Sequence, residues 1–136
     1  IQEMAPAVVY ELPIIICTFN NGYLGNVRQW QEQFYNKRYS YTCMRRRKSC
    51  STTCNSPNPC CPEYIPDFIQ LAKSYGAEGI RVTESEEIKA ALLKAKQNTK
   101  TPTIIEFVID REINVMPIVP PGYPLNGMML ESEDGK

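Results

Sequence analysis

The residues whose types and spacing favour chemistry come at the end of the first apolar run, in the stretch CTFNNGYLGNVRQWQ at residues 17 to 31. Asn20 and Asn21 end the run, and Gly22 and Gly25 follow them. An asparagine side-chain oxygen is a hard, neutral ligand that suits Mg²⁺, and a glycine turn can aim a main-chain carbonyl at the same ion. A helix that begins near Gly25 would add free N–H groups and a positive dipole end, which favour a diphosphate. The stretch therefore predicts a site for Mg²⁺ and a diphosphate.

Both features of this stretch also have an ordinary structural explanation. Asn and Gly are common turn formers, so Asn-Asn-Gly also suits a simple strand-to-helix turn. Val27, Trp30, Gln31 and Phe34 recur three and four residues apart, as in one stripe of a helix. Trp30 is the only tryptophan, and a tryptophan in such a stripe is usually part of the core. Considered alone, the residues leave both interpretations open.

Three apolar runs predict the strands that would position this stretch. PIIICTF at residues 13 to 19 is continuous rather than alternating, which is typical of a central strand with both faces covered in a parallel sheet. TIIEFVI at residues 103 to 109 has the same character, and GIRVT at residues 79 to 83 is shorter. The first of these strands would bury the thiol of Cys17 in the core.

One helix is expected before the first strand along the chain, and three more are expected after it. The segment IQEMAPAVVYEL has helical character, although Pro6 forces that helix to start late or to kink. A second helix is expected just beyond Gly25. After a long irregular segment, a third helix begins at Pro66, which suits a first helical position, and ends at Gly76.

A fourth helix carries an apolar stripe from Ile88 to Ala95, and Thr83 and Glu86 precede it at capping-box spacing. The alternation of helices and strands predicts an α/β fold, a three-layer α/β/α sandwich with a mostly parallel sheet. Ligands of such sheets bind beyond the carboxyl ends of the strands, which is where Asn20 and Asn21 would lie.

The irregular segment is rich in cysteine. Five thiols fall within a loop at residues 43 to 62, and they are Cys43, Cys50, Cys54, Cys60 and Cys61. The chain has no histidine, so a closed zinc site would need four cysteines, and there is no Cys-x-x-Cys pair. Reduced or oxidised loop cysteines, a zinc or iron-sulfur site and a redox switch all remain open.

Composition excludes several classes of function. The chain has 15 basic and 15 acidic residues, and its one basic run, RRRK at residues 45 to 48, more often forms a solvated loop than a nucleic-acid surface. No apolar run approaches the roughly 20 residues that cross a bilayer, and no signal peptide is evident. We therefore expect a cytoplasmic protein that binds neither nucleic acid nor membranes.

Three stretches carry a resemblance to a known family. FNNGYLGNVRQWQEQFYNKRYSYT, PDFIQLAKSYGAEGIRV and EFVIDREINVMPIVPPG resemble the C-terminal thiamine-diphosphate-binding domain of the acetolactate synthase (acetohydroxyacid synthase) catalytic, or large, subunit. The resemblance covers nearly the whole chain except the cysteine-rich stretch. It implies a thiamine-diphosphate-binding fold over residues 1 to 117, truncated at its N-terminus, and a C-terminal arm over residues 118 to 136.

The resemblance also assigns roles to particular residues. The Asn21 side chain and the Tyr23 main-chain oxygen would bind Mg²⁺, and Trp30 and Asn26 would lie at the substrate channel. Asn26 departs from the family, which usually has methionine there. The arm around Pro120, Pro121 and Gly122 would fold over the active site. The residues that would line the diphosphate and the thiazolium ring are Gly22, Tyr23, Leu24, Gly25 and Asn26.

The implied reaction is the decarboxylation of pyruvate and the condensation of the product with pyruvate or 2-ketobutyrate, in branched-chain amino acid biosynthesis. The parent enzyme would be a carboligase that uses thiamine diphosphate, Mg²⁺ and FAD, and would form a homodimer or tetramer with a possible regulatory small subunit. The family's Gly-Asp-Gly motif and its activating glutamate are missing here, so no catalytic residue is expected in this chain, and the chain alone should be inactive.

Two other interpretations remain. The chain could come from another thiamine-diphosphate-dependent 2-ketoacid decarboxylase or carboligase. It could also be a non-catalytic interaction module that a metal bound to the cysteine cluster stabilises.

Overall fold

The computed structural model describes residues 1–44, 50, 61 and 66–131. The chain forms two compact units. Unit 1 comprises Ile1–Asn21 and Pro66–Ile109, and unit 2 comprises Gly22–Ile65 and Asp110–Lys136. Cys54, Cys60 and the basic run at residues 45 to 48 lie outside the described residues.

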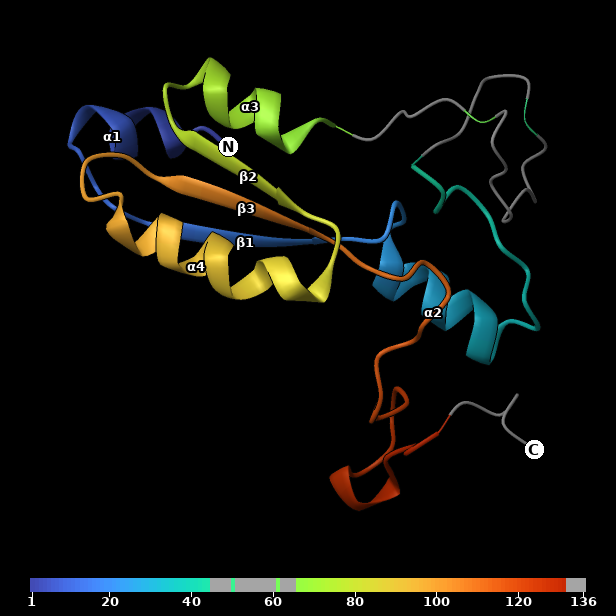
Figure 1. The fold of residues 1–136 in the computed structure, drawn as a ribbon. Helices are drawn as coiled ribbons and strands as arrows, with labels where there is room; N and C mark the ends of the chain where they lie inside the picture. The colour runs from blue at the N-terminus through green and yellow to red at the C-terminus, as the bar shows by residue number, and fades with distance from the viewer. Residues whose placement is uncertain (45–49, 51–60, 62–65, 132–136) are drawn as a thin grey trace. The chain divides into compact units, whose positions relative to one another are not determined.

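Unit 1 contains a three-stranded sheet in which every pair of neighbouring strands is parallel (Figure 1). Its strands are β1 (Ile15–Asn20), β2 (Glu78–Val82) and β3 (Thr103–Val108), in the order β1-β3-β2. Asn20 pairs with Val108, and Val82 pairs with Phe107, so the carboxyl ends of the strands lie at one edge of the sheet. The predicted α/β class with a parallel sheet is confirmed.

β1 lies at the edge of this sheet, so the prediction that residues 13 to 19 form a central, doubly covered strand is wrong. Its residues alternate between exposed and half-buried along the strand. Cys17 is exposed, which corrects its predicted place in the core. β3 is the central strand, and all but its last residue are buried. A continuous apolar run shows that a strand is apolar, but it does not show which neighbours cover the strand.

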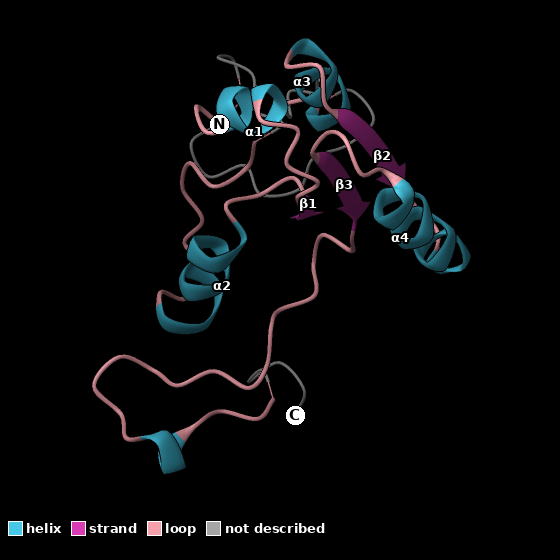
Figure 2. Cartoon of the chain, turned by 90° about the vertical axis from the view of Figure 1, so that its left-hand side faces the viewer, coloured by secondary structure: helices cyan, strands magenta, loops and turns pink. Residues whose placement is uncertain are grey.

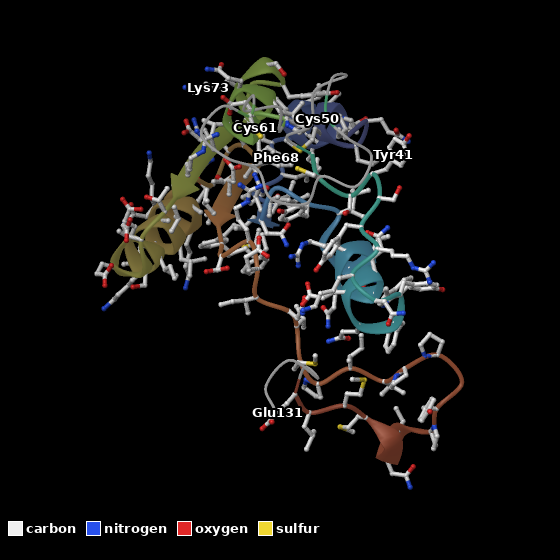
Figure 3. All side chains as sticks on the ribbon, turned by 90° about the vertical axis from the view of Figure 1, so that its right-hand side faces the viewer. Tyr41, Cys50, Cys61, Phe68, Lys73 and Glu131 are labelled. Atoms are coloured by element: carbon white, nitrogen blue, oxygen red, sulfur yellow. The ribbon has the colours of Figure 1, made fainter. Side chains whose placement is uncertain are left out.

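Helices cover both faces of the sheet, which confirms the three-layer sandwich (Figure 2). The helices α1 (Met4–Val9) and α3 (Phe68–Ser74) pack on one face and α4 (Ile88–Gln97) on the other. The α1/α3 core consists of Met4, Ala72, Ala77 and Ile104, and the α4 core of Val82, Ala91, Ala95, Ile105 and Phe107. Figure 3 labels Phe68, which packs against the α1/α3 core, and Lys73, which is exposed in the last turn of α3.

The helix starts follow local capping chemistry. Pro6 lies in the first turn of α1, where its missing N–H is not needed, so the predicted late start is confirmed. α3 begins after Asp67, whose carboxylate accepts hydrogen bonds from the N–H groups of Ile69 and Gln70. The prediction that Pro66 is the first helical residue is therefore wrong.

The capping box before α4 lies one residue later than predicted. A short 3₁₀ turn, η1 (Ser85–Glu87), precedes the helix, and the reciprocal hydrogen bonds join Glu84 and Glu87 rather than Thr83 and Glu86. The same carboxylate of Glu87 also accepts the Thr83 N–H. The extra turn shifts the register, which spacing alone does not reveal.

Unit 2 contains α2 (Gly25–Phe34), which starts as predicted, and a C-terminal segment with the short helical turn η2 (Leu125–Gly127). The predicted apolar stripe of α2 is wrong. Arg28 and Gln29 are the buried residues of this helix, whereas Val27 is 42% exposed and Trp30 is 40% exposed. Trp30 is therefore not a core residue. None of the described helices is long and apolar enough to span a membrane.

Candidate functional site

Asn20 and Asn21 stand at the carboxyl end of β1, where the sequence places them. The Asn20 side chain donates a hydrogen bond of 2.7 Å to Glu106 Oε1 on the neighbouring strand β3. Asn21 is half-buried and is the last residue of unit 1. The structure thus gives the two carboxamides different surroundings, and Asn20 serves to fix the end of the strand.

A polar row crosses the carboxyl end of the sheet and holds that strand end in place. Glu106 is 2% exposed, and its Oε2 accepts a hydrogen bond of 2.7 Å from Arg81 Nε on β2. This hydrogen bond raises the pKa of Arg81. Arg81 Nη2 also lies 3.1 Å from Asp67 Oδ1, at the cap of α3. One buried carboxylate therefore ties the ends of the three strands together.

Sequence reasoning missed this row. Glu106 is the single charged residue within the apolar run TIIEFVI. A buried charge in a central strand requires partners, so its isolation was a usable signal.

The turn after Asn21 is a short antiparallel pairing with residues 42–44. Gly22 adopts a φ of 74°, which favours glycine, and its carbonyl accepts the Met44 N–H at 3.0 Å. The Leu24 N–H donates to the Thr42 carbonyl at 2.8 Å. Tyr23 sits opposite Cys43 between these two hydrogen bonds, so its own main-chain groups point away from the 42–44 segment. The Tyr23 carbonyl takes no part in this pairing.

The first turn of α2 lacks the carboxylate cap that α3 has. Its N-cap residue, Leu24, forms no side-chain cap, and no acidic residue lies in the first turn. Asp67 fills the corresponding place on α3. Gly25 and Asn26, at the start of α2, are half-buried and exposed, respectively. When no acidic side chain lies at a helix start, the free N–H groups and the positive end of the helix dipole can bind an anionic ligand.

Arg28 lies inside unit 2 between aromatic rings and carboxylates. Its guanidinium carbon is 5.0 Å from the centroids of both the Tyr23 and the Tyr39 rings. Its Nη1 donates to Glu32 at 2.8 Å, and its Nη2 donates to Glu112. Arg28 is only 4% exposed, so these partners stabilise a charge that has left water.

Glu32 and Gln29 join α2 to the segment that follows Asp110. The Glu32 carboxylate accepts hydrogen bonds from the Tyr39 hydroxyl at 2.8 Å and from Asn114 Nδ2 at 2.7 Å. Gln29 makes two hydrogen bonds with the main chain of Val115, donating at 2.8 Å and accepting at 3.1 Å. The buried face of α2 is polar because it binds this segment, which is distant in sequence.

Asn26 and Trp30, the predicted channel residues, are both exposed on α2. In the arm, Pro120 is half-buried, Pro121 is exposed, and Gly122 has a φ of 84°. Among the described residues, no group of three or more His, Cys, Asp or Glu side chains is arranged to hold a metal ion. Because two of the five loop cysteines lie outside that description, the metal hypothesis for the cysteine cluster stays a prediction.

The chain is similar to a known protein family and to several known proteins. The family profile described as "Thiamine pyrophosphate enzyme, C-terminal TPP binding domain" matches residues 1–107. The chain is 39% identical over 121 residues to the acetolactate synthase large subunit of Corynebacterium glutamicum, which covers 89% of this chain and 17% of that protein. It is 30% identical over 134 residues to acetolactate synthase 1, chloroplastic, of Oryza sativa subsp. japonica, covering 98% of this chain and 19% of that protein.

A third relative is the acetolactate synthase isozyme 3 large subunit of Escherichia coli, 29% identical over 136 residues. That similarity covers 98% of this chain and 21% of the relative. The chain therefore spans about a fifth of the length of the relatives that it matches.

Proposed function

Because the chain belongs to the family of C-terminal TPP-binding domains of thiamine pyrophosphate enzymes, we propose that it is the cofactor-binding part of an acetolactate synthase large subunit. The relatives that support this proposal are acetolactate synthases, and the similarity extends over most of the chain. In the parent enzyme, the reaction is the decarboxylation of pyruvate and its condensation with pyruvate or 2-ketobutyrate.

The cofactors in this proposal are thiamine diphosphate and Mg²⁺. The Asn21 side-chain oxygen and the Tyr23 main-chain oxygen would bind the metal ion, since both are neutral, hard ligands. The bound cofactor supplies a thiazolium ring that accepts electrons during decarboxylation. The observation that carries the proposal is the start of α2, which has no acidic cap and follows the Asn-Asn-Gly turn directly.

The residues of the first turn of α2 would receive the diphosphate. Gly22 allows the turn its positive φ, and the N–H groups from Gly25 onward point along the helix axis toward an anion. Leu24 and Asn26 are exposed on either side of Gly25 and would line the cofactor. These are binding and orienting roles, so the chain supplies no acid or base of its own.

Trp30 and Asn26 would contact the second 2-ketoacid. Both side chains are exposed on α2, and an indole provides a large apolar surface that can select between small acyl groups. Asn26 replaces the apolar side chain that the family usually has at this point, so it would alter the preference between the two acceptor ketoacids. The arm from residue 118 to 136, with Pro120 and Pro121, would cover the site and exclude water.

The rest of the machinery would come from the parent protein. FAD, the dimer or tetramer, and a regulatory small subunit belong to this proposal, as does a cytoplasmic location. Residues 1 to 117 would form the cofactor-binding domain. The chain spans about a fifth of its relatives' length, so we expect no catalytic activity from it alone.

Calorimetric titration of the purified chain with thiamine diphosphate tests the proposal. We expect saturable binding that requires Mg²⁺ and weakens about tenfold or more in Asn21→Ala, because one of the few protein ligands of the ion is lost. Asn126→Ala, at an exposed asparagine in η2, is the matched control and should bind like the wild type. Unchanged Mg²⁺-dependent binding in Asn21→Ala would show that this carboxamide is not a ligand.

A further inference from the structure

Arg111 is a half-buried residue of unit 2, and two of its guanidinium nitrogens are buried and unused. Its Nε and Nη2 atoms are both buried, and neither has a hydrogen-bond partner among the residues that the structure describes. A guanidinium group carries a positive charge, and a buried charge without a partner is unfavourable. The described chain therefore lacks the partner that this side chain needs.

The two unused atoms form one edge of the guanidinium. In the planar group, the N–H bonds of Nε and Nη2 point to the same side and form a fork. The fork matches the two oxygens of a carboxylate or phosphate, which arginine binds through two parallel hydrogen bonds. The geometry of the unused donors thus specifies an oxyanion rather than a single carbonyl.

The described carboxylates of unit 2 that bind an arginine bind Arg28 rather than Arg111. Glu32 and Glu112 both accept hydrogen bonds from Arg28, and no described carboxylate forms an ion pair with Arg111. The surroundings of Arg111 are therefore short of negative charge. A negatively charged ligand would restore the balance.

The Tyr23 ring holds the guanidinium in place without occupying its edge. The Arg111 guanidinium carbon lies 5.1 Å from the centroid of the ring, which is a contact with the ring face. The phenol is neutral, since burial raises the pKa of Tyr23, so it provides no counter-charge. Stacking therefore fixes the orientation of the fork and leaves its donors to another group.

We propose that the Nε and Nη2 edge of Arg111 is an oxyanion-binding site that takes two oxygens of a carboxylate or phosphate group. The site goes beyond the proposed cofactor contacts, since Arg111 lies outside residues 1–107, where the family profile matches. It uses neither of the two oxygen atoms that are proposed to bind Mg²⁺. A diphosphate and the carboxylate of a 2-ketoacid share the required chemistry, and the two arms of the experiment separate them.

The experiment follows the Nε–H resonances of the full chain labelled with ¹⁵N-arginine, in EDTA, during titration with pyrophosphate in one arm and pyruvate in the other. Arg111→Lys lacks an Nε–H and so assigns the Arg111 signal. We expect this signal to shift saturably in at least one arm, and the responding arm identifies the source of the oxyanion. No saturable shift in either arm overturns the proposal.

Two substitutions and a control test the fork itself. Arg111→Lys keeps the charge but loses the fork, and Arg111→Gln loses both, so we expect the affinity for the responding anion to fall about tenfold or more in each. Arg38→Gln, which removes an exposed guanidinium of unit 2, should bind like the wild type. Equal affinity in Arg111→Lys and the wild type overturns the proposal. Should Arg111→Gln fail to fold, Arg111→Lys and the wild-type resonance still decide the question.

The outcome is separable from that of the proposed function. The titration in EDTA involves no metal ion, so it does not depend on the proposed Mg²⁺ site. A chain that binds the anion at Arg111 but shows no Mg²⁺-dependent binding of thiamine diphosphate would contradict the proposed function alone.

Discussion

Tyr39 is a phenol whose proton the fold holds tightly. The ring is 8% exposed, and its hydroxyl donates a hydrogen bond of 2.8 Å to Glu32. Burial, followed by this hydrogen bond, raises the pKa of Tyr39 to about 12 from the ordinary value of 10.0. Because the folded state binds this proton more tightly than the unfolded state, the contribution to stability is complete below pH 10 and is lost as the pH rises toward 12.

Tyr39→Phe therefore separates the hydroxyl from the ring. At pH 7 we expect the variant to be less stable by about 2 kcal/mol, since a buried hydrogen bond to a carboxylate is lost. The difference should shrink as the pH rises above 10 and disappear near 12, since only the wild type has the Tyr39 hydroxyl whose ionisation lowers stability there. Urea unfolding of both proteins at several pH values measures this. A difference that stays constant across that range would mean that the phenol titrates normally.

The sequence indicates the residues of the candidate site better than their surroundings. Asn21, Gly22 and Gly25 could be singled out because short-range chemistry determines turns and helix starts. Arg28 could not, since its burial depends on Tyr39 and on Glu112, which lies 84 positions away along the chain. An argument from hydrophobic periodicity assigns arginine to the surface, so it predicted that Trp30, rather than Arg28, lies on the buried face of α2.

The contact between α3 and β2 depends on the absence of a side chain at Gly79. A Cβ atom built there would lie 3.0 Å from both Cα and Cγ2 of Ile69 and 3.2 Å from its carbonyl oxygen. Since two of these atoms belong to the helix backbone, the helix itself would have to move. Gly79 therefore sets how closely α3 approaches the sheet.

Gly79→Ala should destabilise the chain by about 1–3 kcal/mol, because the methyl group overpacks the contact with α3. The loss must exceed the small gain that alanine brings by restricting the unfolded chain. Chemical denaturation followed by circular dichroism measures the effect. Glu78→Ala, at the exposed neighbouring position, is the control and should change stability by less than about 0.5 kcal/mol. A Gly79→Ala variant as stable as the wild type would show that α3 adjusts freely.

At the scale of helices and strands, the sequence predicted which elements form but not how they are covered. The order of helices and strands followed from alternating periodicities and from glycine and proline positions. The edge position of β1 could not be predicted, because its apolar run resembles that of the central strand β3. The exact caps of α3 and α4 were also missed, since a proline and a capping-box spacing each fit more than one helix start.

For the whole molecule, an exposed apolar surface lies on the side of β1 that shares a face with α4. Ile15, Cys17 and Phe19 lie on this face, and all three are exposed. Phe19 is 68% exposed, although its ring stacks on Phe107 with centroids 5.3 Å apart. The α4 core draws its strand residues from β2 and β3, which explains why the β1 part of the face is left uncovered.

An apolar face of this kind should make the isolated chain bind hydrophobic dyes and associate at high concentration. We expect Phe19→Lys to reduce both the fluorescence of bound anilinonaphthalene sulfonate and the concentration dependence of the sedimentation coefficient severalfold. Leu125→Lys, at a residue of η2 that is 77% exposed, is the control and should change neither. Equal dye binding in Phe19→Lys and the wild type would show that the dye binds to a different surface.

The pairing of β1 with β3 also determines when the sheet can assemble. Asn20 and Glu106, which bond across these strands, are 86 positions apart in the sequence. A chain made from its N-terminus therefore releases β1 from the ribosome long before its partner exists, and closing so long a loop slows folding. During that interval the apolar strand is open to wrong partners, so a nascent chain of this design benefits from a chaperone until β3 arrives.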